Sequence, residues 1–329
     1  MASSTIASTS LGKVTIIGSG LIGRSWSALF ARRGYDVCLY DTVSSQLEVA
    51  RSVLDTLLVQ WGDEDWLKEG ENAQTVLARI RYSDSLAESL NKAVYVQECV
   101  PENVQLKESV FKQIDELVGD DTILASSTSC IIPSKFTKGL KHESMCIVAH
   151  PVNPPYYCTL VEVVPSPWTT PETVKKTIAI QKEIGQSPIL VRREVNGFVL
   201  NRIQYAILME CWRLVEEGVC SPEDADIALT EGIGMRYAFM GNFETMQLNA
   251  NGAVDYCQKY GDNIKKICLE QQELGARDLS GPTLDKVSQY LNSKIPIDKL
   301  EERRAWRDDW LKAIAKEKIK RKDMALQNL

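Results

Sequence analysis

The chain has 329 residues, of which 44% are hydrophobic and 25% charged, so it has room for two domains with buried cores. Its 38 basic and 44 acidic side chains leave a formal charge of −6 at pH 7, which argues against a nucleic-acid binder that relies on bulk electrostatics. Only two histidines occur, His142 and His150, so a multi-histidine metal site is nearly excluded and no metal is predicted.

The first half of the chain alternates short apolar runs with amphipathic stretches. Strand followed by helix, repeated with strands that are apolar throughout, is typical of a doubly wound parallel sheet. We therefore predict an α/β fold with an N-terminal Rossmann-type sheet. The strands are expected at residues 13–17, 36–40, 93–97, 122–125, 145–149, 159–164 and 188–191, and the helices at 21–33, 44–60, 102–118 and about 171–185.

In the rest of the chain the signals are helical, with almost no strand. Apolar side chains recur at helical spacing across 196–217, and Gly218 suits the end of that helix. Ser221, followed by a proline and two acids, predicts the start of the next helix. The expected organisation is an α/β domain at 1–194 followed by an all-α domain at 195–329. The long apolar helix suits either a core or a subunit interface.

The first predicted strand runs into a glycine-rich segment with the spacing Gly-x-Gly-x-x-Gly, from Gly18 to Gly23. A strand before it and a helix after it are the context in which this spacing binds a dinucleotide. Gly18 permits the tight turn, Gly20 lets a pyrophosphate approach the backbone, and Gly23 lets the helix pack closely on the strand. Together with Leu21 and Ile22, they form the predicted cofactor loop. The alternative is a plain tight turn.

Asp41 ends the second predicted strand, about twenty residues beyond the glycines, where a dinucleotide site places an acid. A carboxylate there accepts the ribose hydroxyls and repels a 2′-phosphate, and no arginine follows immediately to reverse that preference. NAD is therefore predicted rather than NADP. The alternative, a solvated acid at a strand end, does not explain why it coincides with the glycines.

Two predicted strands end in groups that can do chemistry. The strand at 122–125 runs into the hydroxyl-rich segment 126–129, and the strand at 145–149 runs into His150. Ligands of doubly wound sheets gather at the carboxyl ends of the strands. We therefore expect one sheet edge to offer a hydroxyl that hydrogen-bonds a substrate oxygen and an imidazole that takes its proton.

Glu162 lies within an apolar, strand-like run, where an unpaired charge is costly. A hydrogen bond to His150 removes that cost, holds the imidazole in one tautomer and stabilises its cation. The alternatives are a core histidine without chemistry and an edge-strand acid that faces water. His142 lies in a polar segment and is expected at the surface as an ordinary loop residue.

Two segments follow predicted strands, one lies within a predicted strand and one starts the long helix: Ser127-Thr128-Ser129, His150-Pro-Val-Asn153-Pro-Pro, Leu160-Val-Glu162-Val and Gly197-Phe-Val-Leu-Asn201-Arg202. Together they resemble the 3-hydroxyacyl-CoA dehydrogenase family, and the resemblance covers nearly the whole chain. It implies a cytosolic, NAD-dependent, homodimeric dehydrogenase that oxidises the 3-hydroxyl of a hydroxy acid.

The family pattern, matched position by position, implies the roles of the catalytic residues. His150 becomes the base and Glu162 its partner. Ser129 and Asn201 correspond to the side chains that hold the substrate oxygen and the imidazole.

The same pattern implies three further cofactor positions. Glu102 and Lys107 correspond to cofactor contacts, although the residues by themselves indicate the exposed first turn of a helix. Asn153 corresponds to a position close to the nicotinamide.

Finer features resemble the lambda-crystallin branch of that family, which implies L-gulonate as the hydroxy acid. They are the segments that begin at His150, Trp212 and Glu231. Arg236, in the last of them, is our candidate to anchor a free carboxylate by a bidentate pair; the alternative is a surface arginine packed on Tyr237. Two other functions stay open, a 3-hydroxyacyl-CoA dehydrogenase and a structural protein of the crystallin type.

The nine cysteines form no C-x-x-C pair and mostly lie in apolar runs, which favours free thiols in a reducing compartment. The first ten residues lack Arg, Lys and an apolar core, so they fit neither a signal peptide nor a transit peptide. No window has the apolar length that a membrane span needs. A cytoplasmic protein without a membrane partner is therefore expected.

Overall fold

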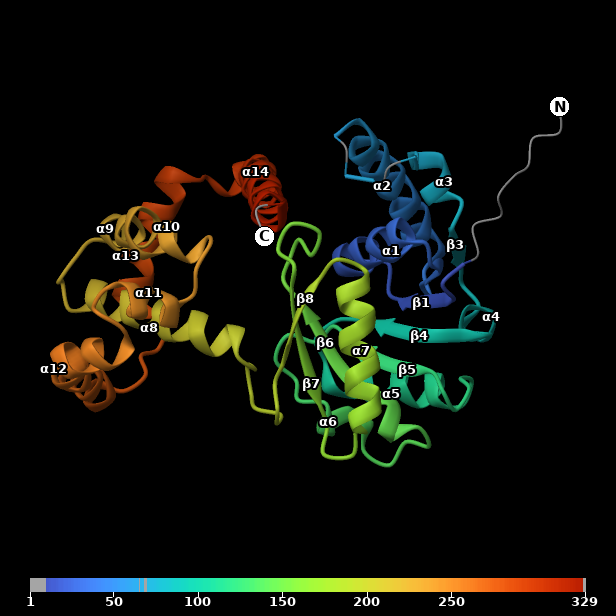
Figure 1. The fold of residues 1–329 in the computed structure, drawn as a ribbon, viewed down its shortest axis with the longest axis horizontal. Helices are drawn as coiled ribbons and strands as arrows, with labels where there is room; N and C mark the ends of the chain where they lie inside the picture. The colour runs from blue at the N-terminus through green and yellow to red at the C-terminus, as the bar shows by residue number, and fades with distance from the viewer. Residues whose placement is uncertain (1–9, 65, 68–69, 328–329) are drawn as a thin grey trace. The chain divides into compact units, whose positions relative to one another are not determined.

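The structure of the chain is a computed structural model that describes residues 10–64, 66–67 and 70–327. It divides into two compact units, Met1–Asn201 and Arg202–Leu329 (Figure 1). The sequence-based domain boundary near residue 194 stays a prediction. Most of the N-terminal stretch that carried the targeting prediction, residues 1–9, lies outside the described residues. Within the described chain, no helix is long and apolar enough to cross a membrane.

The first unit is built on one eight-stranded sheet in the order β3-β2-β1-β4-β5-β6-β7-β8. Every neighbouring pair is parallel except β6 and β7, which are antiparallel. The predicted Rossmann-type α/β fold is thus confirmed, and one edge strand, β3, is added to it. The strands are β1 (Lys13–Ile17), β2 (Asp36–Tyr40), β3 (Ile80–Ser83), β4 (Ala93–Glu98), β5 (Ile123–Ser126), β6 (Cys146–Pro151), β7 (Leu160–Pro165) and β8 (Ser187–Leu190).

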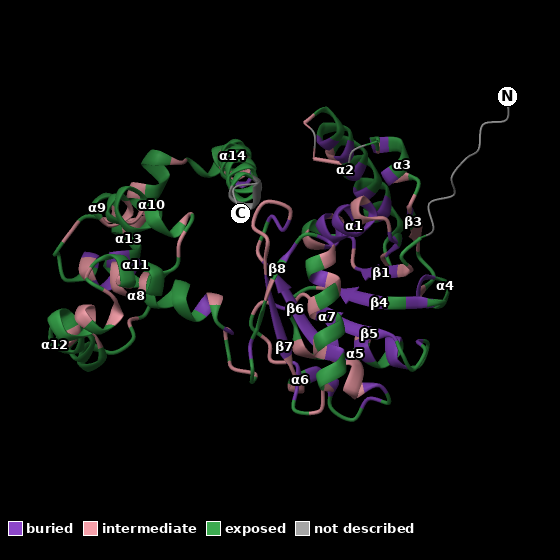
Figure 2. Cartoon of the chain, in the orientation of Figure 1, coloured by how far each residue is buried: buried purple, intermediate pink, exposed green. Residues whose placement is uncertain are grey.

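Helices cover both faces of this sheet, because successive strand residues point to opposite faces and both sets are apolar. One face carries Ile16 and packs against Trp26 and Leu54; the other carries Ile17 and packs against Phe111. Figure 2 shows that the strands are mostly buried, whereas helices such as α2 and α7 also carry exposed residues. The helices are α1 (Leu21–Arg33), α2 (Ser44–Asp63), α3 (Ala73–Leu77), α4 (Leu86–Leu90), α5 (Val104–Asp115), α6 (Ser134–Thr137) and α7 (Pro171–Glu183), with a 3-10 turn at Glu143–Met145.

The second unit is helical, as predicted. Ser221 caps its helix with a full capping box, since its hydroxyl bonds the Asp224 N–H and the Asp224 carboxylate bonds back to the Ser221 N–H. Among the described residues of this unit, the buried hydrophobic side chains are few: Trp212, Val215 and Ala315. The helices are α8 (Leu200–Glu216), α9 (Pro222–Ile227), α10 (Gly234–Tyr237), α11 (Asn242–Leu248), α12 (Ala253–Leu274), α13 (Gly281–Lys294) and α14 (Leu300–Gln327), with short π and 3-10 turns at Ala228–Ile233 and Ile297–Lys299.

Candidate active site

The glycine loop between β1 and α1 has the geometry that a dinucleotide needs. A Cβ on Gly23 would lie 1.9 Å from the carbonyl oxygen of Gly18, so only glycine lets α1 pack this closely on the turn. Gly18 itself has φ +98°, which favours glycine. A Cβ on Gly20 would meet no heavy atom within 4 Å, so the backbone at the start of α1 faces open space. That space suits a pyrophosphate at a helix N-terminus.

The two residues between these glycines have different positions. Leu21 begins α1 and is 54% exposed, whereas Ile22 is half-buried and packs against the core. Both belong to the first turn of the helix, which begins beside the open space at Gly20.

Asp41 lies beside the glycine loop with acceptor capacity to spare. Its Oδ2 accepts hydrogen bonds from the Ser19 N–H (2.8 Å) and hydroxyl (2.7 Å), and its Oδ1 accepts one from the Val43 N–H (3.1 Å). A carboxylate offers about four acceptor positions, so one remains on Oδ1 for a ribose hydroxyl. The adjoining hollow of about 570 Å³ fits an adenosine half, because its wall is largely apolar. It is lined by the loop, Asp41 and residues that include Tyr40, Leu86, Val100, Leu106 and Val110.

Lys107 is buried, only 1% exposed, and does not line that hollow. Its Nζ donates to both carboxylate oxygens of Glu98 (2.9 and 3.1 Å) and to the carbonyl of Val100 (3.2 Å). These bonds use all three donors of an ammonium group. Lys107 therefore holds the end of β4 in place. Sequence reasoning missed Glu98, although an acid ending an apolar strand is a signal for a buried ion pair.

Glu102 anchors the hydroxyl-bearing loop after β5. Its Oε1 accepts hydrogen bonds from the Thr128 hydroxyl (2.6 Å), the Ser129 N–H (3.0 Å) and the Cys130 N–H (3.2 Å). Burial acts to raise the pKa of this carboxyl, but these donors and Lys107 outweigh it, so the pKa lies below its ordinary value. The loop is therefore tied to an ionised carboxylate.

His150 and Glu162 meet across the antiparallel pair of β6 and β7, where they are direct register partners. His150 Nδ1 lies 2.8 Å from Glu162 Oε2, and both side chains are buried. The other carboxylate oxygen accepts the N–H groups of Val199 (2.8 Å) and Leu200 (2.9 Å) at the start of α8. Burial acts to raise the pKa of Glu162, but His150 and these N–H groups outweigh it, so the pKa lies below its ordinary value.

The second ring nitrogen of His150, Nε2, forms no hydrogen bond with any described residue. With Nδ1 donating to the carboxylate, Nε2 is the acceptor of the neutral ring. Nε2 is therefore a proton acceptor, and the hydrogen bond between Nδ1 and Glu162 fixes the orientation of the ring.

Asn201 links the start of α8 to the loop after β5, because its Nδ2 donates to the carbonyl of Ser129 (2.9 Å). The Ser129 hydroxyl lies 3.3 Å from Glu102 Oε1. Neither side chain hydrogen-bonds His150 directly. Asn153 is exposed in the segment after β6 and forms no hydrogen bond with the described residues.

The expectation that His142 is a surface residue is wrong. The ring is buried, 4% exposed; its Nδ1 lies 2.9 Å from Asp115 Oδ1 and its Nε2 lies 3.1 Å from Asp120 Oδ1. Asp115 also accepts the N–H groups of Lys141 (2.6 Å) and His142 (2.9 Å). The end of α5 and the turn after it thus bury the ring between two acids, because those acids satisfy both nitrogens.

Arg236 belongs to the second unit, where it lies in α10 and is exposed. Its guanidinium forms no ion pair or hydrogen bond with the described residues. Tyr237 beside it donates its hydroxyl proton to Asn242 (2.9 Å). Arg236 is therefore available to an anion from solution.

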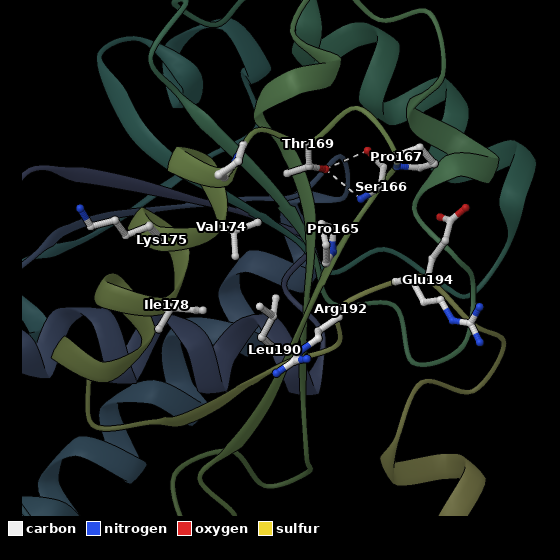
Figure 3. Close-up of a pocket in the computed structure, with 12 residues that line it drawn as sticks. Pro165, Ser166, Pro167, Thr169, Val174, Lys175, Ile178, Leu190, Arg192 and Glu194 are labelled. Carbon is white, nitrogen blue, oxygen red and sulfur yellow. Dashed lines mark hydrogen bonds between the residues drawn. The ribbon is translucent and has the colours of Figure 1, made fainter.

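A second, larger hollow of about 800 Å³ lies between α7 and the segment that follows β8. Figure 3 shows Val174 and Ile178 on one side, Leu190 on the other, and the amino group of Lys175 pointing away. The Thr169 hydroxyl on its wall donates to the carbonyl of Cys146 (2.6 Å) and accepts the Ser166 N–H (2.8 Å). The Ser166 and Thr169 hydroxyls on its wall are already paired with each other, whereas Asp41 keeps an acceptor position for a ligand. The chemistry therefore points to the hollow beside Asp41 instead.

Comparison with known proteins shows that two consecutive parts of the chain match two domains of one family. Residues 13–195 match the NAD binding domain of 3-hydroxyacyl-CoA dehydrogenase, and residues 197–290 match the C-terminal domain of the same family. Lambda-crystallin of Oryctolagus cuniculus is 47% identical over 313 residues, which cover 94% of this chain and 98% of that protein. The lambda-crystallin homolog of Homo sapiens is 48% identical over 317 residues, with the same coverage.

More distant similarity extends to named dehydrogenases. An L-carnitine dehydrogenase of a Pseudomonas species is 32% identical over 300 residues, which cover 91% of each chain. Among solved structures, 5-formyl-3-hydroxy-2-methylpyridine 4-carboxylic acid 5-dehydrogenase, described as an NAD⁺-dependent dismutase, superposes with a TM-score of 0.72. It is 30% identical, and the match covers 92% of this chain and 96% of that one.

Proposed function

The chain belongs to the 3-hydroxyacyl-CoA dehydrogenase family of NAD-dependent oxidoreductases, and we propose that it oxidises the 3-hydroxyl of a free hydroxy acid, with His150 as the base. The observation that carries this proposal is the arrangement of one imidazole. Its Nδ1 is held by Glu162 at 2.8 Å, and its Nε2, at the carboxyl end of β6, has no hydrogen-bond partner among the described residues. This is the edge at which a doubly wound sheet binds its ligands.

In the proposed reaction, His150 Nε2 takes the proton of the substrate hydroxyl. NAD, when bound, supplies the acceptor for the hydride that leaves the carbinol carbon. Glu162 keeps the ring in the tautomer that can accept a proton and stabilises the imidazolium that forms. Ser129 hydrogen-bonds the substrate oxygen, and Asn201 holds the carbonyl of Ser129, which orients that loop. General base assistance of this kind contributes about 10²–10⁴-fold in rate.

The cofactor side of the proposal assigns each remaining residue a task. The glycine loop receives the pyrophosphate, and Asp41 receives the adenosine ribose through its remaining acceptor position. Asn153, whose own side chain is exposed, contacts the nicotinamide from the segment after β6. Glu102 reaches the cofactor from the carboxylate oxygen that the β5 loop does not use, and Lys107 supports it from behind (3.6 Å).

For the substrate we propose L-gulonate, oxidised to 3-dehydro-L-gulonate. The similarity to lambda-crystallins and to an L-carnitine dehydrogenase supports a free hydroxy acid rather than a thioester. Arg236 is exposed and its guanidinium has no partner in the part of the chain that the structure describes, which suits a residue that pairs with a substrate carboxylate.

The deciding experiment compares kcat/KM with NAD for L-gulonate and for 3-hydroxybutyryl-CoA. We expect the free acid to be preferred. Preference for the CoA ester would replace our proposal with a 3-hydroxyacyl-CoA dehydrogenase. An Arg236→Ala enzyme that keeps its KM for hydroxy acids would remove Arg236 from the site.

A second candidate function, a structural protein of the crystallin type, is favoured by the 47% identity to lambda-crystallin. It predicts NAD binding without turnover on any hydroxy acid. The same assay therefore separates the two functions.

We also propose that the chain is a cytosolic homodimer. The described cysteines form no disulfide with one another, which suits a reducing compartment. Phe239 and Phe243 in the second unit are 72% and 80% exposed, which suits a subunit interface. Sedimentation equilibrium of the purified chain tests the dimer, and a monomer at micromolar concentration would contradict it.

A further inference from the structure

A buried amide lies behind the candidate active site, outside every role described above. Gln97, on β4, is 0% exposed. Its Nε2 donates to the Ser127 hydroxyl oxygen (2.7 Å) and to the carbonyl oxygen of Ala149 (3.3 Å). Its Oε1 accepts the Tyr95 hydroxyl proton (2.9 Å). Both donors and the acceptor of the amide are therefore occupied.

This amide hydrogen-bonds β6 just beyond the point where its pairing with β5 ends. The ladder between β5 and β6 ends at the pair of Ser126 and Val148, because β5 then leaves the sheet as a loop. From β4, Gln97 reaches past the end of β5 to the next carbonyl of β6. It thereby bridges the two segments that carry Ser129 and His150.

Ser127 is the point where several elements meet. Its oxygen accepts the Gln97 amide and also the indole N–H of Trp26 on α1 (3.1 Å). Because both its acceptor positions are used, its own proton points to the sulfur of Cys99 (3.2 Å). The loop is therefore tied to the helix that begins at the glycine loop as well as to β4.

The far end of this network is Gln181 on α7, also 0% exposed. Its Nε2 donates to the Tyr95 hydroxyl oxygen (3.0 Å), and its own oxygen has no partner among the described residues. Gln181 hydrogen-bonds neither the β5 loop nor β6. It therefore shares the chemistry and burial of Gln97 without its bridge.

We propose that Gln97 is a positioning residue: by bonding Ser127 and Ala149 at once, it fixes the separation between the loop that bears Ser129 and the strand that ends in His150. The catalytic consequence rests on the function proposed above, whereas the bridge itself does not. A misplacement of about 1 Å at such a site costs on the order of 10²-fold in rate.

The test is the Gln97→Met enzyme, which keeps the side-chain length and removes both donors and the acceptor. Gln181→Met is the matched control, since it places the same substitution at an equally buried position. We expect kcat with hydroxy acid and NAD to fall about 10–10²-fold in Gln97→Met, with KM for NAD within about twofold. Gln181→Met keeps kcat within about threefold. An equal loss in both variants would overturn the proposal.

A deuterium isotope effect separates positioning from simple loss of folded protein. With substrate deuterated at the carbinol carbon, slower hydride transfer in Gln97→Met raises the isotope effect on kcat. A smaller folded fraction lowers kcat and leaves the isotope effect as it was. A lower kcat with an unchanged isotope effect therefore contradicts the proposal.

Hydrogen exchange tests the bridge without any turnover. The amides of residues 127–130 exchange faster in Gln97→Met and unchanged in Gln181→Met if Gln97 holds the loop. Should the native chain oxidise no hydroxy acid, the proposed function fails, while this comparison still decides the bridge. Unchanged exchange in Gln97→Met would overturn it.

Discussion

The two histidines have similar surroundings except at the second ring nitrogen, Nε2. Each ring is buried, and each places Nδ1 against a carboxylate, Asp115 for His142 and Glu162 for His150, at 2.9 and 2.8 Å. The difference is at Nε2, which bonds Asp120 in His142 and no described residue in His150. A histidine–carboxylate pair is therefore no mark of a base by itself; the unpaired second nitrogen is what distinguishes His150.

This comparison predicts opposite results for one substitution made at both sites. His150→Gln removes the proton acceptor and lowers kcat by about 10²–10⁴-fold, while the chain still folds and binds NAD. Steady-state kinetics and an NAD titration measure the two effects. Turnover like that of the native chain would show that His150 is as structural as His142.

Glu162→Gln tests whether the carboxylate selects the tautomer. If the amide oxygen keeps the N–H groups of Val199 and Leu200, the amide nitrogen faces His150 Nδ1 and moves the ring proton to Nε2. We expect kcat to fall by about 10²–10⁴-fold, because that nitrogen then has no lone pair for the substrate proton. The double variant with His150→Gln should lose little more than either single one, and additive losses would contradict a shared role.

His142→Gln leaves the chemistry intact and weakens the fold. Glutamine cannot replace both hydrogen bonds of the ring, so Asp115, which is buried, or Asp120 loses its partner. We therefore expect the free energy of unfolding to fall by about 1–3 kcal/mol with kcat unchanged. Urea unfolding and kinetics measure the two. Asp120→Asn is the milder control, since that carboxylate is 92% exposed and should contribute less than about 1 kcal/mol. Loss of kcat in His142→Gln would break the comparison.

Acid conditions expose a stability role of Glu162 as well. Because its pKa in the folded chain is below its ordinary value, the carboxylate stabilises the fold fully above about pH 4.3 and stops doing so as the pH falls through the folded pKa. The free energy of unfolding should therefore fall more steeply below about pH 5 in the native chain than in Glu162→Gln. Parallel curves would show that Glu162 has no such effect.

The strands that were predicted best are β1 and β2, whose ranges agree with the prediction to the residue. Each begins with one charged residue and continues as a short run of mostly apolar residues, which is typical of a buried strand. β3 was missed, since Ile80 is its one buried residue and the strand lies at the sheet edge. A strand at the sheet edge pairs with only one neighbouring strand and is less buried, so its sequence shows no clear apolar pattern.

Site residues were predictable where register or motif fixed their neighbours. Glu162 lies twelve residues after His150, and an antiparallel return makes the two register partners. The partners of His142 lie 27 and 22 residues earlier, on a helix end and a turn whose packing no spacing reveals. Gln97 was missed as well, although a lone amide inside an apolar strand is a signal that a buried partner exists.

The two oxygens of Glu162 have a consequence for how such sequences are inherited. One oxygen serves the imidazole, and the other holds the first turn of α8. A descendant that gave up the reaction would still keep the acid, because losing it frees two N–H groups at the start of a helix. Only the histidine at position 150 could then be replaced without this cost to the fold. If His150 is the base as we propose, a change at position 150 in such a descendant reports lost chemistry, whereas an acid kept at position 162 reports only that the fold survives.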